Sequence, residues 1–144
     1  MPHGIGDRDW LDVASYQSAP LAFARAGVAH ADIDLCMVYD SYTITVLVTL
    51  EGLGFCKRGE GGAFCADGRI GLGGALPVNP DGGGLSSNHP GMRGIFLVIE
   101  AARQLRGQGG AAQVAGAKLA CVHGTGGMLG QRHSGVTMIL GRAA

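Results

Sequence analysis

The sequence has few of the residues that mark several protein classes. Aromatic residues make up 6% of the 144 residues and charged residues 15%, with 11 Lys and Arg balanced by 11 Asp and Glu. Such a chain lacks the basic, base-stacking surface of a nucleic-acid-binding protein. The longest apolar run, ITVLVTL, is too short to span a membrane and leads into Glu51. The first residues, MPHGIGDRDW, lack the charged-then-apolar pattern of a secretory signal, so we expect a cytoplasmic protein.

Cysteine is scarce and widely spaced. The four residues, Cys36, Cys56, Cys65 and Cys121, form no C-x-x-C pair, whereas structural zinc sites usually need ligands that close together in the chain. We therefore expect no metal site, and reduced thiols as in other cytoplasmic proteins.

Apolar residues and glycine, in contrast, are abundant. Hydrophobic residues account for 47% of the chain, which at this length supports one folded domain. Glycine occurs 27 times, gathered within 52–74, 82–94 and 107–130 and without a collagen-like period. These stretches predict loops between packed elements.

The apolar pattern alternates between helical and strand character, which predicts an α/β domain. The expected helices span 12–26, 41–53 and 92–105, and the expected strands span 33–39, 118–123 and 136–140. Residues 78–85 fit a strand or a turn, and 59–74 a glycine-rich loop. Gly27 and Gly54 are helix stop signals. In the last helix Ile95, Val98, Ile99 and Ala102 share the face that we expect to pack on the sheet.

The stretch from 79 to 94, NPDGGGLSSNHPGMRG, places one histidine between glycine turns and a helix. Glycine allows unusual backbone angles, and Pro90 suits a first helical turn, whose free N–H groups can face an anion. The pattern fits a functional loop that aims His89 at a ligand, and it also fits a structural turn.

The succession N-P-x-G-G-G, x-H-P-G and a helix ending in Q-L-R-G resembles the C-terminal half of the thiolase superfamily. The likeness is strongest to the branch of sterol-carrier-protein-type thiolases and steroid side-chain aldolases. It continues upstream through AFARAGVAHADIDLCMVYDSYTITVLVTLEGLGFC and downstream through KLACVHGTGGMLG to GVTMILG. It implies an α/β fold, a truncated C-terminal half of the thiolase fold with a mixed sheet and helices, at 14–144 after a tail at 1–13.

The resemblance implies a role for His89, because the family's G-H-P histidine works beside an acyl thioester and this chain has Asn88-His89-Pro90. A loop histidine can donate to a developing oxyanion or exchange a proton near neutral pH. The resemblance also implies that Gly83, Gly84 and Asn88 contact the substrate. The alternative for His89 is an exposed or helix-capping residue.

A second candidate site lies at Tyr39-Asp40-Ser41-Tyr42, where a strand gives way to a helix and where ligands gather in α/β folds. Sterol-carrier-type thiolases have H-D-C-F here and ordinary thiolases N-E-A-F. This chain has Tyr39 for the histidine and Ser41 for the cysteine. The Tyr39 hydroxyl can donate to an oxyanion or act as an acid, or it can simply pack. We expect Asp40 to cap the helix.

The third candidate is the loop C-V-H-G-T-G-G from Cys121 to Gly127. Ordinary thiolases carry C-x-G here, and its cysteine is the base. The resemblance puts His123 nearest that position and Cys121 inside the strand, although either could serve as base. It also implies that Gly126 contacts the substrate.

Two parts of the family pattern have no counterpart in this chain. The acyl-carrying cysteine belongs to the family's N-terminal half, and Cys36, Cys56 and Cys65 do not lie in its motif. Residues 1–11 are too polar to form the first strand of the C-terminal half, which we expect to be a missing middle strand. Unpaired backbone groups would then need a partner, so we expect a fragment or a subunit and not a stable monomer.

Two functions follow from the resemblance. The first is the C-terminal part of a thiolase-like enzyme that performs acyl transfer or thiolysis of a 3-oxoacyl-CoA, or retro-aldol cleavage of a 3-hydroxyacyl-CoA. It would be inactive as the isolated chain, would use the coenzyme A thioester as substrate, and would need no other cofactor. The second is a non-catalytic module that binds acyl-CoA or a partner. The expected partners are a second copy of the chain, a complementing thiolase N-terminal half, or a zinc-ribbon/OB-fold protein.

Overall fold

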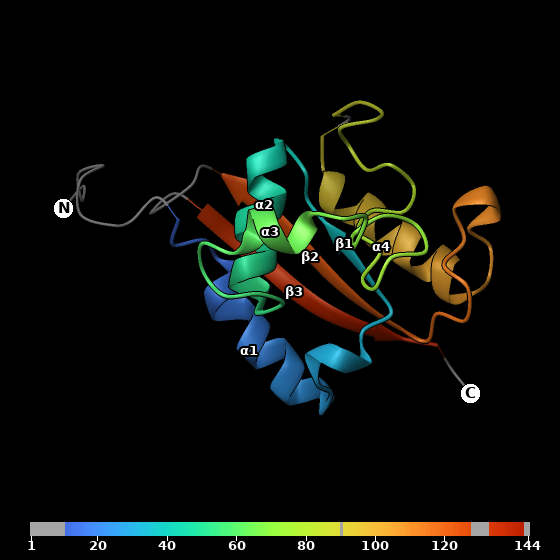
Figure 1. Ribbon diagram of the computed structural model, residues 1–144, viewed down its shortest axis with the longest axis horizontal. Helices are drawn as coiled ribbons and strands as arrows, with labels where there is room; N and C mark the ends of the chain where they lie inside the picture. Colours follow the sequence, from blue (N-terminus) through green and yellow to red (C-terminus); the bar gives the residue numbers. More distant parts are fainter. Residues whose placement is uncertain (1–10, 90, 128–132, 143–144) are drawn as a thin grey trace.

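The computed structural model describes residues 11–89, 91–127 and 133–142. Its helices are α1 (Ser15–Ala26), α2 (Thr43–Leu53), α3 (Gly61–Cys65) and α4 (Arg93–Leu105), with short 3-10 turns η1 (His30–Asp32) and η2 (Gly110–Ala112). Its strands are β1 (Leu35–Val38), β2 (Leu119–Gly127) and β3 (His133–Gly141) (Figure 1). Most of the predicted tail at 1–13, and Pro90, lie outside the described residues.

The predicted helices and strands are confirmed, with shifts at their ends. Gly27 and Gly54 end α1 and α2 in the left-handed conformation, with φ of 67° and 89°, which glycine adopts without strain. Helix α3 lies inside the stretch expected to be only loop. Of residues 78–85, only Val78 bridges a strand, opposite Cys36, and the rest is turn. No helix in the described part of the chain combines the length and apolarity that a membrane span requires.

The described strands form one sheet in the order β1-β2-β3. Strand β1 is parallel to β2, from Leu35 opposite Ala120 to Val38 opposite His123, and β2 is antiparallel to β3. The expectation of a missing middle strand is therefore wrong, because β1 bonds directly to β2 and the ladder has no gap between them. The final antiparallel pair is confirmed.

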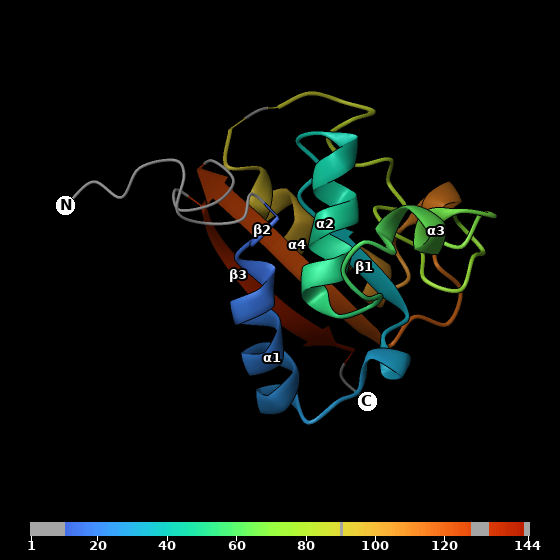
Figure 2. The same cartoon turned by 60° about the vertical axis from the view of Figure 1, so that its left-hand side comes forward.

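Helices cover both faces of the sheet, which gives three layers. In Figure 2, α1 and α2 lie in front of the strands and α4 behind them. Phe23 of α1 and Leu50 of α2 pack with Cys36, Val38 and Cys121 on the first face. The second face has its own core, in which α4 meets alternate residues of the same strands: Leu35, Met37, Leu97, Ala101, Leu105, Ala120 and Val122.

Helix α4 turns a different face to the sheet from the one predicted. Leu97, Ala101 and Leu105 are buried there, whereas Ile95 and Ile99 are 53% and 48% exposed. The prediction failed because α4 carries apolar residues around more than half of its circumference. The helix therefore packs on the sheet, as expected, but keeps an uncovered apolar stripe.

Candidate functional site

A cavity of about 400 Å³ lies where β1 ends and α2 and α4 begin. We call it the Tyr39 cavity, and its lining joins three separate parts of the chain: Tyr39, Asp40, Ser41, Tyr42, Gly84, Leu85, Asn88, His89 and Arg93. The carboxyl ends of strands are the usual place for ligands in α/β folds. The fold therefore brings the Tyr39 and His89 motifs together, with Gly84 and Asn88 beside them.

Tyr39 and His89 are in direct contact. The Tyr39 Oη and His89 Nε2 atoms are 2.6 Å apart, and the two rings meet edge to face at 5.9 Å between centroids. The Gly91 N–H donates to His89 Nδ1 over 3.4 Å. In the neutral tautomer that fits both contacts, Nε2 carries the proton and donates to Tyr39, which leaves the phenolic O–H to face a third group.

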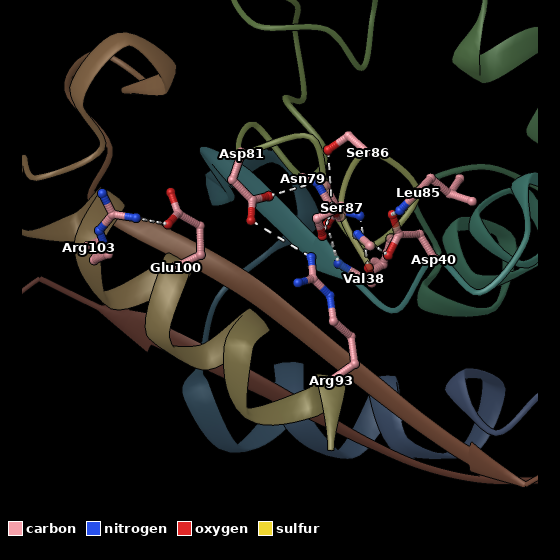
Figure 3. Close-up of polar contacts among 12 residues, drawn as sticks. Val38, Asp40, Asn79, Asp81, Leu85, Ser86, Ser87, Arg93, Glu100 and Arg103 are labelled. Atoms are coloured by element: carbon pink, nitrogen blue, oxygen red, sulfur yellow. Dashed lines mark hydrogen bonds and ion pairs between the residues drawn. The ribbon is translucent and has the colours of Figure 1, made fainter. Parts of the chain in front are cut away.

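Asp40 holds the loop of residues 79–85, which we call the glycine loop, and it does not cap α2 as expected. Its carboxylate accepts hydrogen bonds from the backbone N–H groups of Gly84 at 2.9 Å and Leu85 at 3.0 Å (Figure 3). At the start of α2, the Thr45 hydroxyl takes the capping place by accepting the Tyr42 N–H. A Cβ atom on Gly83 would lie 2.2 Å from Asp40 Oδ2, and so glycine is required for this approach. Gly83 thereby serves the loop–carboxylate contact, while its predicted contact with substrate stays a prediction.

Two further polar residues, Asn79 and Arg93, fix this region, and neither was predicted from the sequence as a site residue. The Asn79 side chain exchanges two hydrogen bonds of 2.9 Å with the backbone of Val38, which ties the glycine loop to the end of β1. Arg93 opens α4 and is 8% exposed, and its Nη2 atom lies 3.8 Å from Asp81 Oδ2. The N-P-x-G-G-G pattern signalled the loop, but an arginine at the start of a helix gave no signal of its burial.

His123 lies apart from the Tyr39 cavity. Its side chain on β2 is fully buried, and its Nδ1 atom is 2.8 Å from the Thr137 hydroxyl, which in turn contacts the Ser18 hydroxyl at 2.7 Å. It faces α1, whereas Tyr39 packs with the core under α4. The described residues thus do not bring His89 and His123 into one pocket, and a base role for His123 stays a prediction.

Cys121 and Gly126 also lie outside the Tyr39 cavity. Cys121 is fully buried opposite Cys36, and the thiol–thiol hydrogen bond of this pair, together with burial, raises the pKa of Cys36 well above its ordinary value. Gly126 borders a second, open groove of about 410 Å³ between α4 and the β2–β3 pair, lined by Ile95, Val98 and Val136 among others. Among the described residues, no group of three or more His, Cys, Asp or Glu side chains could hold a metal ion.

Comparisons with known proteins agree with this fold. Residues 4–142 match the family described as thiolase C-terminal domain-like. The chain is 41% identical over 115 residues to an acetyl-CoA acetyltransferase of Methanothermobacter thermautotrophicus, covering 79% of this chain and 30% of that protein. It is 45% identical over 85 residues to a steroid side-chain-cleaving aldolase of Thermomonospora curvata, covering 59% of this chain and 21% of that protein.

A solved structure shows the same likeness. A chain of the Ltp2-ChsH2(DUF35) aldolase superposes with a TM-score of 0.72 and 33% identity, covering 89% of this chain and 31% of that one. The chain thus spans less than a third of the length of each of these relatives. Because the family match extends over nearly all of its residues, the chain belongs to the thiolase C-terminal domain-like family.

Proposed function

We propose that this chain is the C-terminal domain of a thiolase-like enzyme that cleaves a 3-hydroxyacyl-CoA by a retro-aldol reaction. The observation that carries the proposal is the 2.6 Å contact between Tyr39 Oη and His89 Nε2 at the rim of a cavity. This pair favours proton transfer, because a phenol and an imidazole can both give and take protons and Tyr39 stands where sterol-carrier-type thiolases have a histidine. The aldolases among the relatives support the same choice.

In this reaction Tyr39 acts as the general base that takes the proton of the substrate's 3-hydroxyl group. The Tyr39 phenol first passes its proton to water. Its oxygen then takes the 3-hydroxyl proton, the O–H electron pair forms the new carbonyl, and the C2–C3 bond breaks. The electron pair of the broken C2–C3 bond moves to the thioester oxygen as an enolate. C2 then takes the proton that water received, which completes the shorter acyl-CoA. The products are this acyl-CoA and a ketone or aldehyde. The hydrogen bond from His89 Nε2 compensates the negative charge on the deprotonated phenol oxygen.

The active form is proposed to be an assembly in which another polypeptide segment, such as a thiolase N-terminal half, completes the enzyme. The chain's short span relative to its relatives supports this, as do the exposed apolar residues of α4. The same two observations favour the second candidate, a non-catalytic assembly or acyl-CoA-binding module. That candidate predicts binding of a partner or acyl-CoA without turnover.

The experiment compares turnover of 3-hydroxyacyl-CoA substrates by the chain alone and by its complex with a co-purified partner. Tyr39→Phe should lower turnover of the active complex by roughly 100- to 10,000-fold, the usual range for loss of a general acid or base. His89→Asn should have a similar effect. Tyr16→Phe is the matched control, since Tyr16 lies on α1 outside the cavity lining. Near-normal turnover by Tyr39→Phe would refute the mechanism, and binding without any turnover would favour the module.

A further inference from the structure

The segment that carries His89 begins and ends at a charged pair. Asp81 lies at its start and Arg93 at its end, with 3.8 Å between Asp81 Oδ2 and Arg93 Nη2. Figure 3 shows the Arg93 side chain extending from the start of α4 toward the loop, where it faces Asp81. The ion pair thus closes the base of a loop that has His89 near its far end.

The first half of this loop is held by further contacts. Asp40 binds the N–H groups of Gly84 and Leu85, and the hydroxyls of Ser86 and Ser87 donate to the Gly83 carbonyl. In the second half, His89 is exposed, and its hydrogen bonds in the described residues go to Tyr39 and to the nearby Gly91 N–H. The position of His89 therefore depends on how firmly the chain is fixed where it enters α4.

Arg93 is buried there at a cost in free energy. Its Nε and Nη2 atoms are buried and make no hydrogen bond with the described residues, so the guanidinium is held by the charge of Asp81. A buried donor left without a partner lowers the stability of the folded state. The residue before it, Met92, has a left-handed φ of 45°, which is strained for a non-glycine residue and turns the chain into α4. The strained backbone of Met92 and the unpartnered N–H groups of Arg93 thus lie beside the Tyr39 cavity, which indicates that this local structure serves the site.

We propose that Arg93 is a positioning residue, which acts through Asp81 to close the base of the loop and keep His89 Nε2 on Tyr39 Oη. The role of this contact in catalysis rests on the proposed function. The positioning itself rests on the geometry alone. It can therefore be tested without turnover, and failure of one proposal is distinguishable from failure of the other.

The test records the imidazole nitrogen shifts of the histidines by NMR in the full chain, with Tyr39→Phe as the reference for a lost contact. Arg93→Gln should shift the His89 nitrogens by more than half of the Tyr39→Phe change, while the His30 and His123 signals stay in place and report an intact fold. Arg93→Lys, which keeps the charge, should restore part of the wild-type signal. Arg103→Gln is the matched control, because Arg103 is on the same helix and pairs with Glu100 at 2.8 Å.

Asp81→Asn provides the second arm, and it removes the partly exposed member of the pair. It should move the His89 nitrogen shifts in the same direction as Arg93→Gln. The double variant should change these shifts no more than Arg93→Gln alone, because the effects of two residues that act as one pair are not additive. Unchanged His89 signals in either single variant with an intact fold would overturn the proposal, as would fully additive effects. If Arg93→Gln fails to fold, the Asp81→Asn result decides by itself.

Discussion

His89 and His123 occupy opposite environments within one small domain. His89 is exposed on a loop, where its ring contacts Tyr39, whereas His123 is fully buried on a strand, where its ring contacts Thr137. A thiolase-like pattern marks both as candidate site residues in the sequence. The structure separates them: the first borders a cavity, and the second is part of the contact between the sheet and α1. The difference shows that a motif can identify a loop without telling which of its side chains is open to a ligand.

The largest expected effect is on stability, from His123→Ala. The change leaves a cavity beside α1 and removes one of the two hydroxyl contacts of Thr137, and so it should lower the free energy of unfolding by about 2–4 kcal/mol. Urea unfolding followed by circular dichroism measures it. A loss below about 1 kcal/mol would mean that His123 is not a structural residue, and would strengthen its candidacy as a base.

The cysteines offer a second comparison between a fully buried side chain, Cys36, and a partly exposed one, Cys56, and pH tests it. Burial, and then the charges of Glu51, Cys65 and Glu60, raise the pKa of the Cys56 thiol to about 11. At pH 9 it should be alkylated about 75-fold more slowly than an ordinary thiol of pKa about 8.5, since only about 1% is thiolate, and its rate should rise as the pH approaches 11. Cys36, closed inside the sheet, should stay unreactive over this range. Mass spectrometry of peptides after iodoacetamide treatment gives both rates.

The same raised pKa values set the direction of the pH dependence of stability. Between about pH 8.5 and 11 the folded state keeps thiol protons that the unfolded chain releases. The free energy of unfolding is therefore fully retained below about pH 8.5 and decreases as the pH rises toward 11. A melting temperature that rises between pH 9 and 11 would contradict this sign.

An intermediate effect is expected from Gly83→Ala, which tests how tightly the loop is held. The new Cβ would meet Asp40 Oδ2 at 2.2 Å, and the residue has a left-handed φ of 67°. We expect a loss of about 1–3 kcal/mol in urea unfolding, because the carboxylate must move from the loop N–H groups. Gly62→Ala is the control, since nothing lies within 4 Å of its Cβ position and it is in a helix, and it should be neutral or slightly stabilising. Equal effects at the two positions would show that the Asp40 contact is not a constraint.

The smallest effect on stability is expected from His89→Ala. An exposed loop residue usually changes the free energy of unfolding by less than about 0.5 kcal/mol. The same variant should abolish most turnover of an active assembly, which separates it from His123→Ala. A loss above about 1.5 kcal/mol in the same urea assay would place His89 among the structural residues.

The sequence allowed the elements to be predicted because their patterns and stop signals are local. Gly27 and Gly54 end their helices where expected, and each of the three strands contains a short apolar run. Pairing between strands is not local, and so the prediction of a missing middle strand was wrong. The buried face of α4 also depended on the shape of the sheet, because Ile95 and Leu97 look equally apolar in the sequence.

At the site, the motifs predicted Tyr39 and His89 but not their direct contact. Asp40 was expected to act within its own helix, whereas it binds a loop that follows it by more than forty residues. Arg93 and Asp81 form a pair only because the loop returns on itself. Such contacts depend on the complete fold, and no spacing within a motif reports them.

The parallel pairing of β1 with β2 also has a consequence for how the protein is made. All four residues of β1 are buried, but their partner strand lies at 119–127 and is synthesised long after them. Until those residues leave the ribosome, β1 and the apolar faces of α1 and α2 have no sheet to pack on. Long-range pairing of this kind folds slowly and exposes aggregation-prone surface meanwhile. The nascent chain is therefore expected to remain prone to aggregation until β2 has been translated.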